Sequence, residues 1–221
     1  MSKFEIRNIT SEFRLNDDPD SRTITGLAIP VNSRSQKLYG LFYETIRSEA
    51  ITEDFIQKQD IKFLLNHDAS QGTFARCKYG TGSLRLYVTN RGLEFEFEAP
   101  KTVFGDMLLE GIRRGDYDSM SFAFRMPSDE QSEEWEEAEN GDIYRYINKI
   151  EMIDEISALS CAPAYLDTDI DTKTKTSFER FMQRMKDKKE AEKREQEEID
   201  AQKEQELMTM YDDMLAELEK L

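Results

Sequence analysis

The sequence has very few of the residues that build metal sites and disulfide frameworks. Its 221 residues include two cysteines, Cys77 and Cys161, and one histidine, His67. A structural zinc site needs four ligands, mostly cysteine and histidine, at close spacing. We therefore expect no structural metal, no disulfide and no cofactor, which fits a reducing compartment.

Long hydrophobic runs and an excess of basic charge are also missing. No stretch approaches the ~20 apolar residues of a membrane span, and the N-terminal segment lacks a basic-then-apolar signal sequence. The formal net charge of −16 repels phosphate backbones and anionic lipid surfaces. We expect no nucleic-acid partner, no membrane partner and a location in the cytoplasm of the cell that makes the chain.

Glycine and proline do not occur after residue 171, where Glu, Lys, Gln, Met and Leu dominate. This change predicts a domain over 1–171 and a charged helical tail over 172–221. Apolar residues nearly vanish over 186–199, which indicates a solvated helix held by Glu–Lys pairs or a disordered stretch. The last apolar residues have coiled-coil spacing, which predicts self-association: Leu207, Tyr211, Met214, Leu218 and Leu221.

A two-residue alternation of polar and apolar side chains predicts strands in the first domain. It is clearest in Ser83–Val88 and Leu93–Glu98, which a hairpin turn at 90–92 connects. Further strands are expected at 23–30, 43–46, 117–126, 144–152 and 155–160. The fold class is therefore α+β, with a mostly antiparallel β-barrel or sheet core and a few surrounding helices.

Helical spacing predicts a helix over 102–114, with Gly115 as its C-cap, and a shorter helix over 53–59. The segment 128–142 is too acidic to belong to a core, so we expect a mobile loop there.

The single histidine ends an apolar, strand-like run at Asn66-His67-Asp68. A histidine at a strand end beside a cleft is suited to act as a general base near neutral pH. The alternative is a surface histidine whose hydrogen bonds are only structural.

A second segment carries small residues on one strand face, because Ser119, Ser121 and Ala123 alternate with larger apolar residues. A serine is a weak nucleophile unless a base lies within hydrogen-bond reach, and His67 is the one histidine available. Serines that merely face water are the simpler explanation.

A third segment, Ile153–Tyr165, supplies carboxylates at Asp154 and Glu155 that are suited to orient a histidine. Sequence spacing alone does not show whether any of these groups meet in space.

Taken together, these segments resemble the prohead protease family of tailed bacteriophages, which is similar in fold to the herpesvirus assemblins. The resemblance covers about residues 20–170 and rests on an ordered set of short motifs: Gly26–Ala28, Asn66–Asp68, Gly92-Leu93, Met120–Phe124, Asp154–Ser157 and Pro163–Tyr165.

The resemblance implies that His67 is the base and Ser121 the nucleophile, with Ser119 as the weaker candidate. Where the family usually has Phe-Gly-Phe, this sequence has Ala123. The assemblins use a second histidine, which this chain lacks, so an acid must replace it. The family pattern favours Glu155 over Asp154 and Asp68. Backbone N–H groups suffice for an oxyanion hole, which Arg113 or Arg125 could assist.

The family's activity implies a serine endopeptidase that acts inside the immature procapsid in the bacterial host. Its substrates and partners are the scaffold protein, the scaffolding segment of the major capsid protein and the enzyme itself. The charged tail then serves as a helical handle on the scaffold or shell.

Two other functions are compatible with parts of the sequence. A noncatalytic capsid scaffold or assembly protein would explain the acidic balance and the charged tail. A metal-dependent nuclease would use Asp68, Asp154 and Glu155, although the sequence offers no basic groove for nucleic acid.

Overall fold

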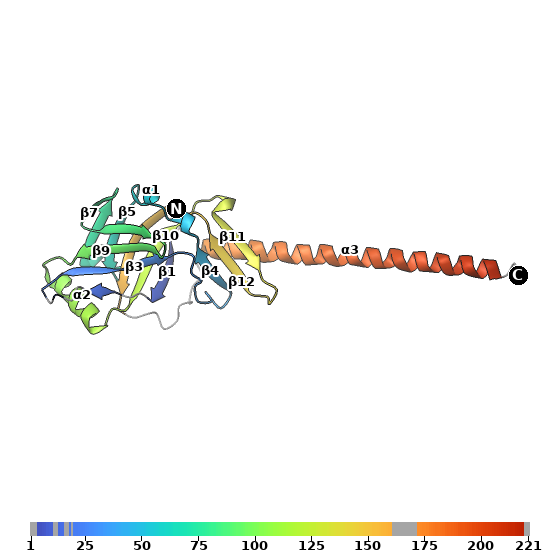
Figure 1. Cartoon of the computed structure of the whole chain (residues 1–221), viewed down its shortest axis with the longest axis horizontal. Helices are drawn as coiled ribbons and strands as arrows, with labels where there is room; N and C mark the ends of the chain where they lie inside the picture. The colour runs from blue at the N-terminus through green and yellow to red at the C-terminus, as the bar shows by residue number, and fades with distance from the viewer. Residues whose placement is uncertain (1–3, 11–12, 16–17, 19, 161–171, 219–221) are drawn as a thin grey trace. The chain divides into compact units, whose positions relative to one another are not determined.

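The computed structural model of the chain describes residues 4–10, 13–15, 18, 20–160 and 172–218, without the side chains of residues 10, 130, 172, 173 and 211–218. The chain divides into two compact units, Met1–Asp171 and Thr172–Leu221. Within the described ranges, the first unit contains three β-sheets and two α-helices, and the second is one long helix (Figure 1). The α+β class and the C-terminal helix expected from the sequence are confirmed.

The largest sheet has six strands. In chain order these are β1 (Glu5–Thr10), β5 (Asp60–Leu65), β6 (Ala75–Lys78), β7 (Thr81–Gly82), β10 (Ser119–Arg125) and β13 (Met152–Leu159). Their order in the sheet is β1-β10-β13-β5-β6-β7. The β13–β5 pair is parallel and the other four pairs are antiparallel, so β13 joins the two directions in the middle of the sheet.

Two smaller sheets complete the first unit. One has the order β2-β3-β9-β8, and the other has the order β11-β12-β4. Their bounds are β2 (Arg14–Leu15), β3 (Thr23–Pro30), β4 (Phe42–Ile46), β8 (Arg85–Thr89), β9 (Gly92–Glu98), β11 (Glu133–Glu137) and β12 (Ile143–Ile147). Only β12–β4 is parallel in these two sheets. Every sheet of the described residues keeps two edge strands, so the core consists of open sheets and not of a closed barrel.

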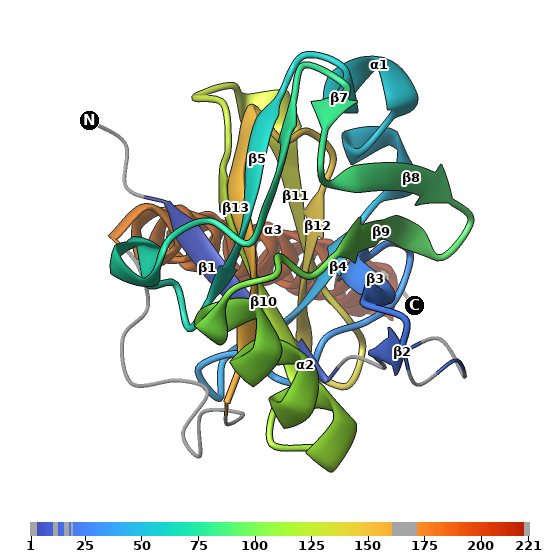
Figure 2. The same cartoon turned by 90° about the vertical axis from the view of Figure 1, so that its left-hand side faces the viewer.

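The helices of the first unit begin and end at the expected residue types. Helix α1 (Glu53–Ile56) is shorter than expected, and the Thr52 hydroxyl caps it by accepting from the Phe55 N–H. Helix α2 (Val103–Arg114) is capped by Thr102 and ends at Gly115, whose φ of 77° is in the left-handed region that favours glycine. α1 and α2 lie at opposite ends of the unit (Figure 2). Three short 3₁₀ helices, η1 (Ser48–Ala50), η2 (Ala69–Gln71) and η3 (Glu130–Ser132), connect other elements.

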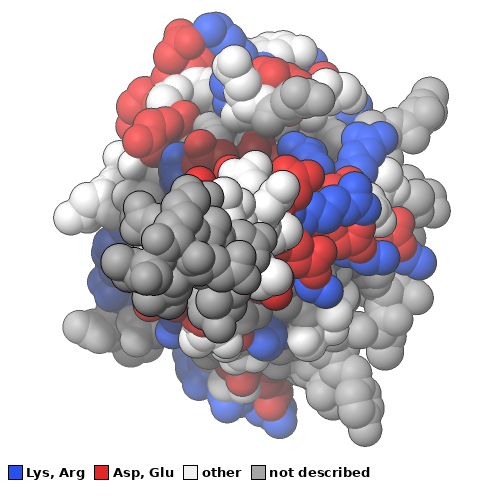
Figure 3. All heavy atoms as spheres, turned by 90° about the vertical axis from the view of Figure 1, so that its right-hand side faces the viewer, with Lys and Arg blue, Asp and Glu red and all other residues white. Residues whose placement is uncertain are grey.

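The acidic segment 128–142 is a strand and turns, so the mobile loop expected there is wrong. Strand β11 pairs with β12, and the Trp135 ring packs edge-on against Phe42 with centroids 4.8 Å apart. Basic partners compensate the acidic side chains: Arg47 binds Glu134 at 2.6 Å and Lys149 binds Asp129 at 2.9 Å. These ion pairs with basic residues outside the segment, which composition does not reveal, explain why the segment 128–142 is ordered. On the face shown in Figure 3, basic and acidic side chains are likewise interleaved.

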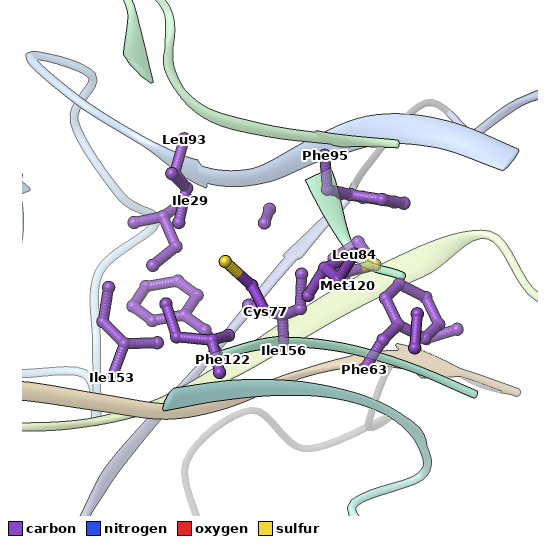
Figure 4. Packing of buried hydrophobic residues seen from close by; sticks show 14 of the residues in the cluster. Ile29, Phe63, Cys77, Leu84, Leu93, Phe95, Met120, Phe122, Ile153 and Ile156 are labelled. Carbon is purple, nitrogen blue, oxygen red and sulfur yellow. The ribbon is translucent and has the colours of Figure 1, made fainter. Parts of the chain in front are cut away.

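The hydrophobic core lies between the six-stranded and four-stranded sheets. Figure 4 shows Leu93 and Phe95 of β9 facing Phe122 of β10 and Ile156 of β13, all of them buried. Because side chains alternate along a strand, the core-facing residues of β10 and β13 leave Ser121 and its neighbours on the opposite face of the sheet.

A buried ion cluster joins the six-stranded sheet to the three-stranded sheet. Arg7 of β1 binds Glu44 of β4 at 2.7 Å and Glu5 at 2.9 Å, and Arg145 of β12 binds both carboxylates at 2.8 Å. All four side chains are at least nine-tenths buried. Burial alone lowers the pKa of Arg7, but Glu44 and Glu5 outweigh it and hold that pKa above its usual value. Both guanidinium groups therefore stay charged inside the protein.

The second unit is helix α3 (Thr172–Leu218), and its residues 186–210 are exposed. Lys–Glu pairs one turn apart follow this stretch at 3.6–4.0 Å, as in Lys186–Glu190 and Lys193–Glu197. Of the two alternatives for 186–199, the solvated helix is confirmed. The coiled-coil prediction involves mainly side chains beyond residue 210, which lie outside the described set.

Removing one carboxylate from the buried cluster should lower the stability of the protein. We predict that Glu44→Ala lowers the free energy of unfolding by about 3–5 kcal/mol, because both buried arginines lose a partner. Urea unfolding followed through Trp135 fluorescence measures this change. Glu134→Ala, which removes the exposed partner of Arg47, is the control and should cost ~1 kcal/mol or less. Similar small losses in both variants would contradict this account.

Candidate active site

Three of the residues singled out by the sequence, His67, Ser121 and Glu155, lie on the side of the six-stranded sheet that points away from the core, and His67 contacts Glu155. Ser121 of β10 pairs directly with Ser157 of β13, and Ser157 pairs with Leu64 of β5 on its other side. Glu155 lies two residues before Ser157 and therefore on the same face. His67 follows β5 by two residues, so β13 stands between the strand of the serine and the strand of the histidine.

A tight turn after β5 holds His67. The Asp68 N–H donates to the Leu65 carbonyl at 3.0 Å, and the φ angles of Asn66 and His67 are 52° and 60°. Two consecutive left-handed residues define a type I′ turn, in which Asn is favoured. A histidine in this conformation is strained, and such strain is a reason to examine the residue for function.

The His67 ring contacts a buried carboxylate. Its Nδ1 lies 2.5 Å from Oε1 of Glu155, whose side chain is 6% exposed, while the His67 side chain is 28% exposed. This contact orients the ring and leaves Nε2 without a hydrogen bond to any described residue. The arrangement matches the orienting acid that the family pattern implied at Glu155.

The other two candidate acids do not contact the histidine. Asp154 forms an ion pair with Lys62 at 3.3 Å on the surface of the sheet. Asp68 accepts hydrogen bonds from Ser70 and Gln71, and these bonds hold the pKa of Asp68 below its usual value. Neither carboxylate is therefore arranged to orient the imidazole.

Ser121 is fully buried, and its hydroxyl donates to the backbone carbonyl of Arg7 at 3.1 Å. It makes no hydrogen bond to the His67 ring in the described part of the chain. Catalytic hydrogen bonds are often absent or long before substrate binds, and rotation about Cα–Cβ redirects a serine hydroxyl. Ser119, the weaker candidate, donates to Asp118 at 2.8 Å. It pairs with Leu159, so it lies two residues further from Glu155 along the strands than Ser121 does.

Sequence reasoning gave no role to two elements of this site. Ser157 donates to Oε2 of Glu155 and accepts from the backbone N–H of His67 at 3.2 Å. Strand β1, which was not expected at all, supplies the Arg7 carbonyl and pairs Asn8 with Ser121. The buried charges of β1 hid the alternation by which strands are found.

The arginines considered for the oxyanion hole have other contacts. Arg113 binds Glu110 on the exposed face of α2 at 3.1 Å, and the Arg125 guanidinium lies 4.6 Å from the centre of the Phe4 ring. These contacts do not support a direct role for either side chain.

Other kinds of site find no support among the described residues. Burial raises the pKa of the Cys77 thiol, which makes it a poor nucleophile. The described Cys, His, Asp and Glu residues form no group of three or more that could hold a metal ion. None of the described helices is long and apolar enough to cross a membrane.

Comparisons with known proteins show the family of the chain. The solved structure of the bacteriophage T4 capsid assembly protease gp21 is similar with a TM-score of 0.40 and 12% sequence identity, covering 71% of this chain and 96% of that chain. No curated protein sequence matches the chain. The family model described as caudovirus prohead serine protease matches residues 10–184, which is more than half of the chain. The chain therefore belongs to the caudovirus prohead serine protease family.

Proposed function

We propose that the chain is the endopeptidase of head maturation that cleaves the scaffold protein, the scaffolding segment of the major capsid protein and itself. In this proposal Ser121 is the nucleophile, His67 the general base and Glu155 the acid that orients it. The observation that carries the proposal is the contact between the only histidine and a buried carboxylate, on the sheet face that also carries Ser121.

The chemistry follows from the His67 Nε2, which has no hydrogen-bond partner among the described residues. Glu155 accepts from the His67 Nδ1–H and so leaves the Nε2 lone pair to take the Ser121 proton. The Ser121 oxygen attacks the peptide carbonyl, and His67 then returns the proton to the leaving amine. Water then attacks the acyl-enzyme carbonyl while His67 takes its proton, and His67 returns that proton to the Ser121 oxygen as it leaves. Ser121 must first release the Arg7 carbonyl, so its present hydrogen bond belongs to a resting state.

The substrates and the location follow from the family's role and not from the geometry. An enzyme with these substrates acts inside the immature procapsid, in the cytoplasm of the bacterial host. Helix α3 has a long exposed surface over residues 186–210, which suits a handle for packaging by helix pairing or for self-association.

The nucleophile can be assigned by self-cleavage. We expect purified wild-type chain at high concentration to give fragments whose intact masses identify the cut sites. Ser121→Ala should abolish these fragments because it removes the hydroxyl proposed to form the acyl-enzyme, whereas Ser119→Ala should retain them. Cleavage by Ser121→Ala at the wild-type rate would assign the reaction to another residue.

The orienting acid can be tested with an amide variant. Glu155→Gln should slow self-cleavage on the order of 10⁴-fold, because an amide cannot fix the imidazole tautomer as a carboxylate does. Asp154→Asn is the matched control on the neighbouring position. It should change the rate by less than about fivefold, since Asp154 only pairs with Lys62 at the surface. Equal effects of the two variants would reject Glu155 as the orienting acid.

A further inference from the structure

Ser157 is fully buried beside the proposed triad, and its single hydroxyl serves two partners. It donates to Oε2 of Glu155 and accepts from the backbone N–H of His67 at 3.2 Å. These are the acid of the proposed triad and the residue that the acid orients. The same hydroxyl thus contacts both ends of the His67–Glu155 interaction.

The bond to Glu155 fixes the carboxylate. One carboxylate oxygen faces His67 Nδ1, and the other would be a buried acceptor without a partner among the described residues if the Ser157 hydroxyl were absent. The terminal torsion of a glutamate is broad and is not fixed by the side chain itself. Two partners, one on each oxygen, hold the carboxylate in the orientation that binds the ring.

The bond to His67 stabilises a strained backbone. His67 has a φ of 60°, a left-handed conformation that costs a non-glycine residue energy unless its surroundings hold it. The backbone N–H groups of this turn make two hydrogen bonds to β13: the Asn66 N–H donates to the Ala158 carbonyl at 2.8 Å, and the His67 N–H donates to Ser157. The second bond acts at the residue from which the imidazole projects.

We propose that Ser157 is a positioning residue of this protease, which sets both the backbone of His67 and the carboxylate of Glu155 for proton transfer. This inference rests on the proposed roles of His67 and Glu155. Ser157 is not a second nucleophile, because its proton is donated to Glu155.

The single histidine makes a direct test possible by nuclear magnetic resonance. In a Ser121→Ala parent, which cannot cleave itself, the Nδ1–H of ¹⁵N-labelled His67 should give one far-downfield proton signal from its bond to Glu155. Ser157→Ala should remove or broaden this signal and speed hydrogen exchange of the His67 backbone amide. Ser157→Thr, which keeps the hydroxyl, should preserve both.

Ser132→Ala is the matched control, since Ser132 is also buried and its hydroxyl donates to the backbone carbonyl of Asp129, away from the site. It should leave the His67 signal unchanged even if it lowers the melting temperature. An unchanged signal and unchanged amide exchange in a folded Ser157→Ala variant would overturn the inference.

Activity provides the second readout, in chains that keep Ser121. Ser157→Ala should slow self-cleavage by about 100-fold, the scale of a small misplacement of a catalytic group, and Ser157→Thr should restore most of the rate. A wild-type rate in Ser157→Ala would contradict the positioning role. If the proposed function were wrong and this inference right, Ser121→Ala would cleave like wild type. The His67 signal would still depend on Ser157.

Discussion

The candidate site depends on one constraint, the pairing of β13 with an antiparallel neighbour on one side and a parallel neighbour on the other. This pairing puts Ser121 opposite Ser157 and brings the end of β5, with His67, beside Glu155. A slip of one residue would turn Glu155 and Ser157 toward the core and Ile156 toward the site. The burial of Ile156 between the two larger sheets therefore also sets the register of the face that carries the candidate site.

Strand β1 connects this face to the rest of the unit. Its Arg7 side chain enters the buried cluster with Glu44 and Arg145, while its backbone carbonyl accepts the Ser121 hydroxyl. Burying four charges is expensive, and it is tolerated because each charge has partners at hydrogen-bond distance. The strand whose carbonyl accepts the Ser121 hydroxyl is thus anchored through its charged side chains to another sheet.

Local features of the fold were predictable from the sequence, and long-range ones were not. Helix α2 and the β8–β9 hairpin carry their own signals, the Thr102 and Gly115 caps and the short turn before Gly92. The candidate residues His67 and Glu155 came from ordered motifs, and their contact required a parallel pairing between strands that are distant in sequence. β1 and β11 were missed because their charged residues pair with Arg145, which lies 140 residues from Glu5 and 12 residues from Glu133, and such pairs do not appear in a local pattern.

The central claim, that His67 activates Ser121, is tested most directly by a small serine-directed reagent. After treatment with diisopropyl fluorophosphate, peptide mass mapping reports which hydroxyl has displaced fluoride from phosphorus. The account predicts an adduct on Ser121 in the wild-type chain and none in His67→Ala. An adduct on Ser119 instead, or one on Ser121 that forms equally fast in His67→Ala, would contradict it.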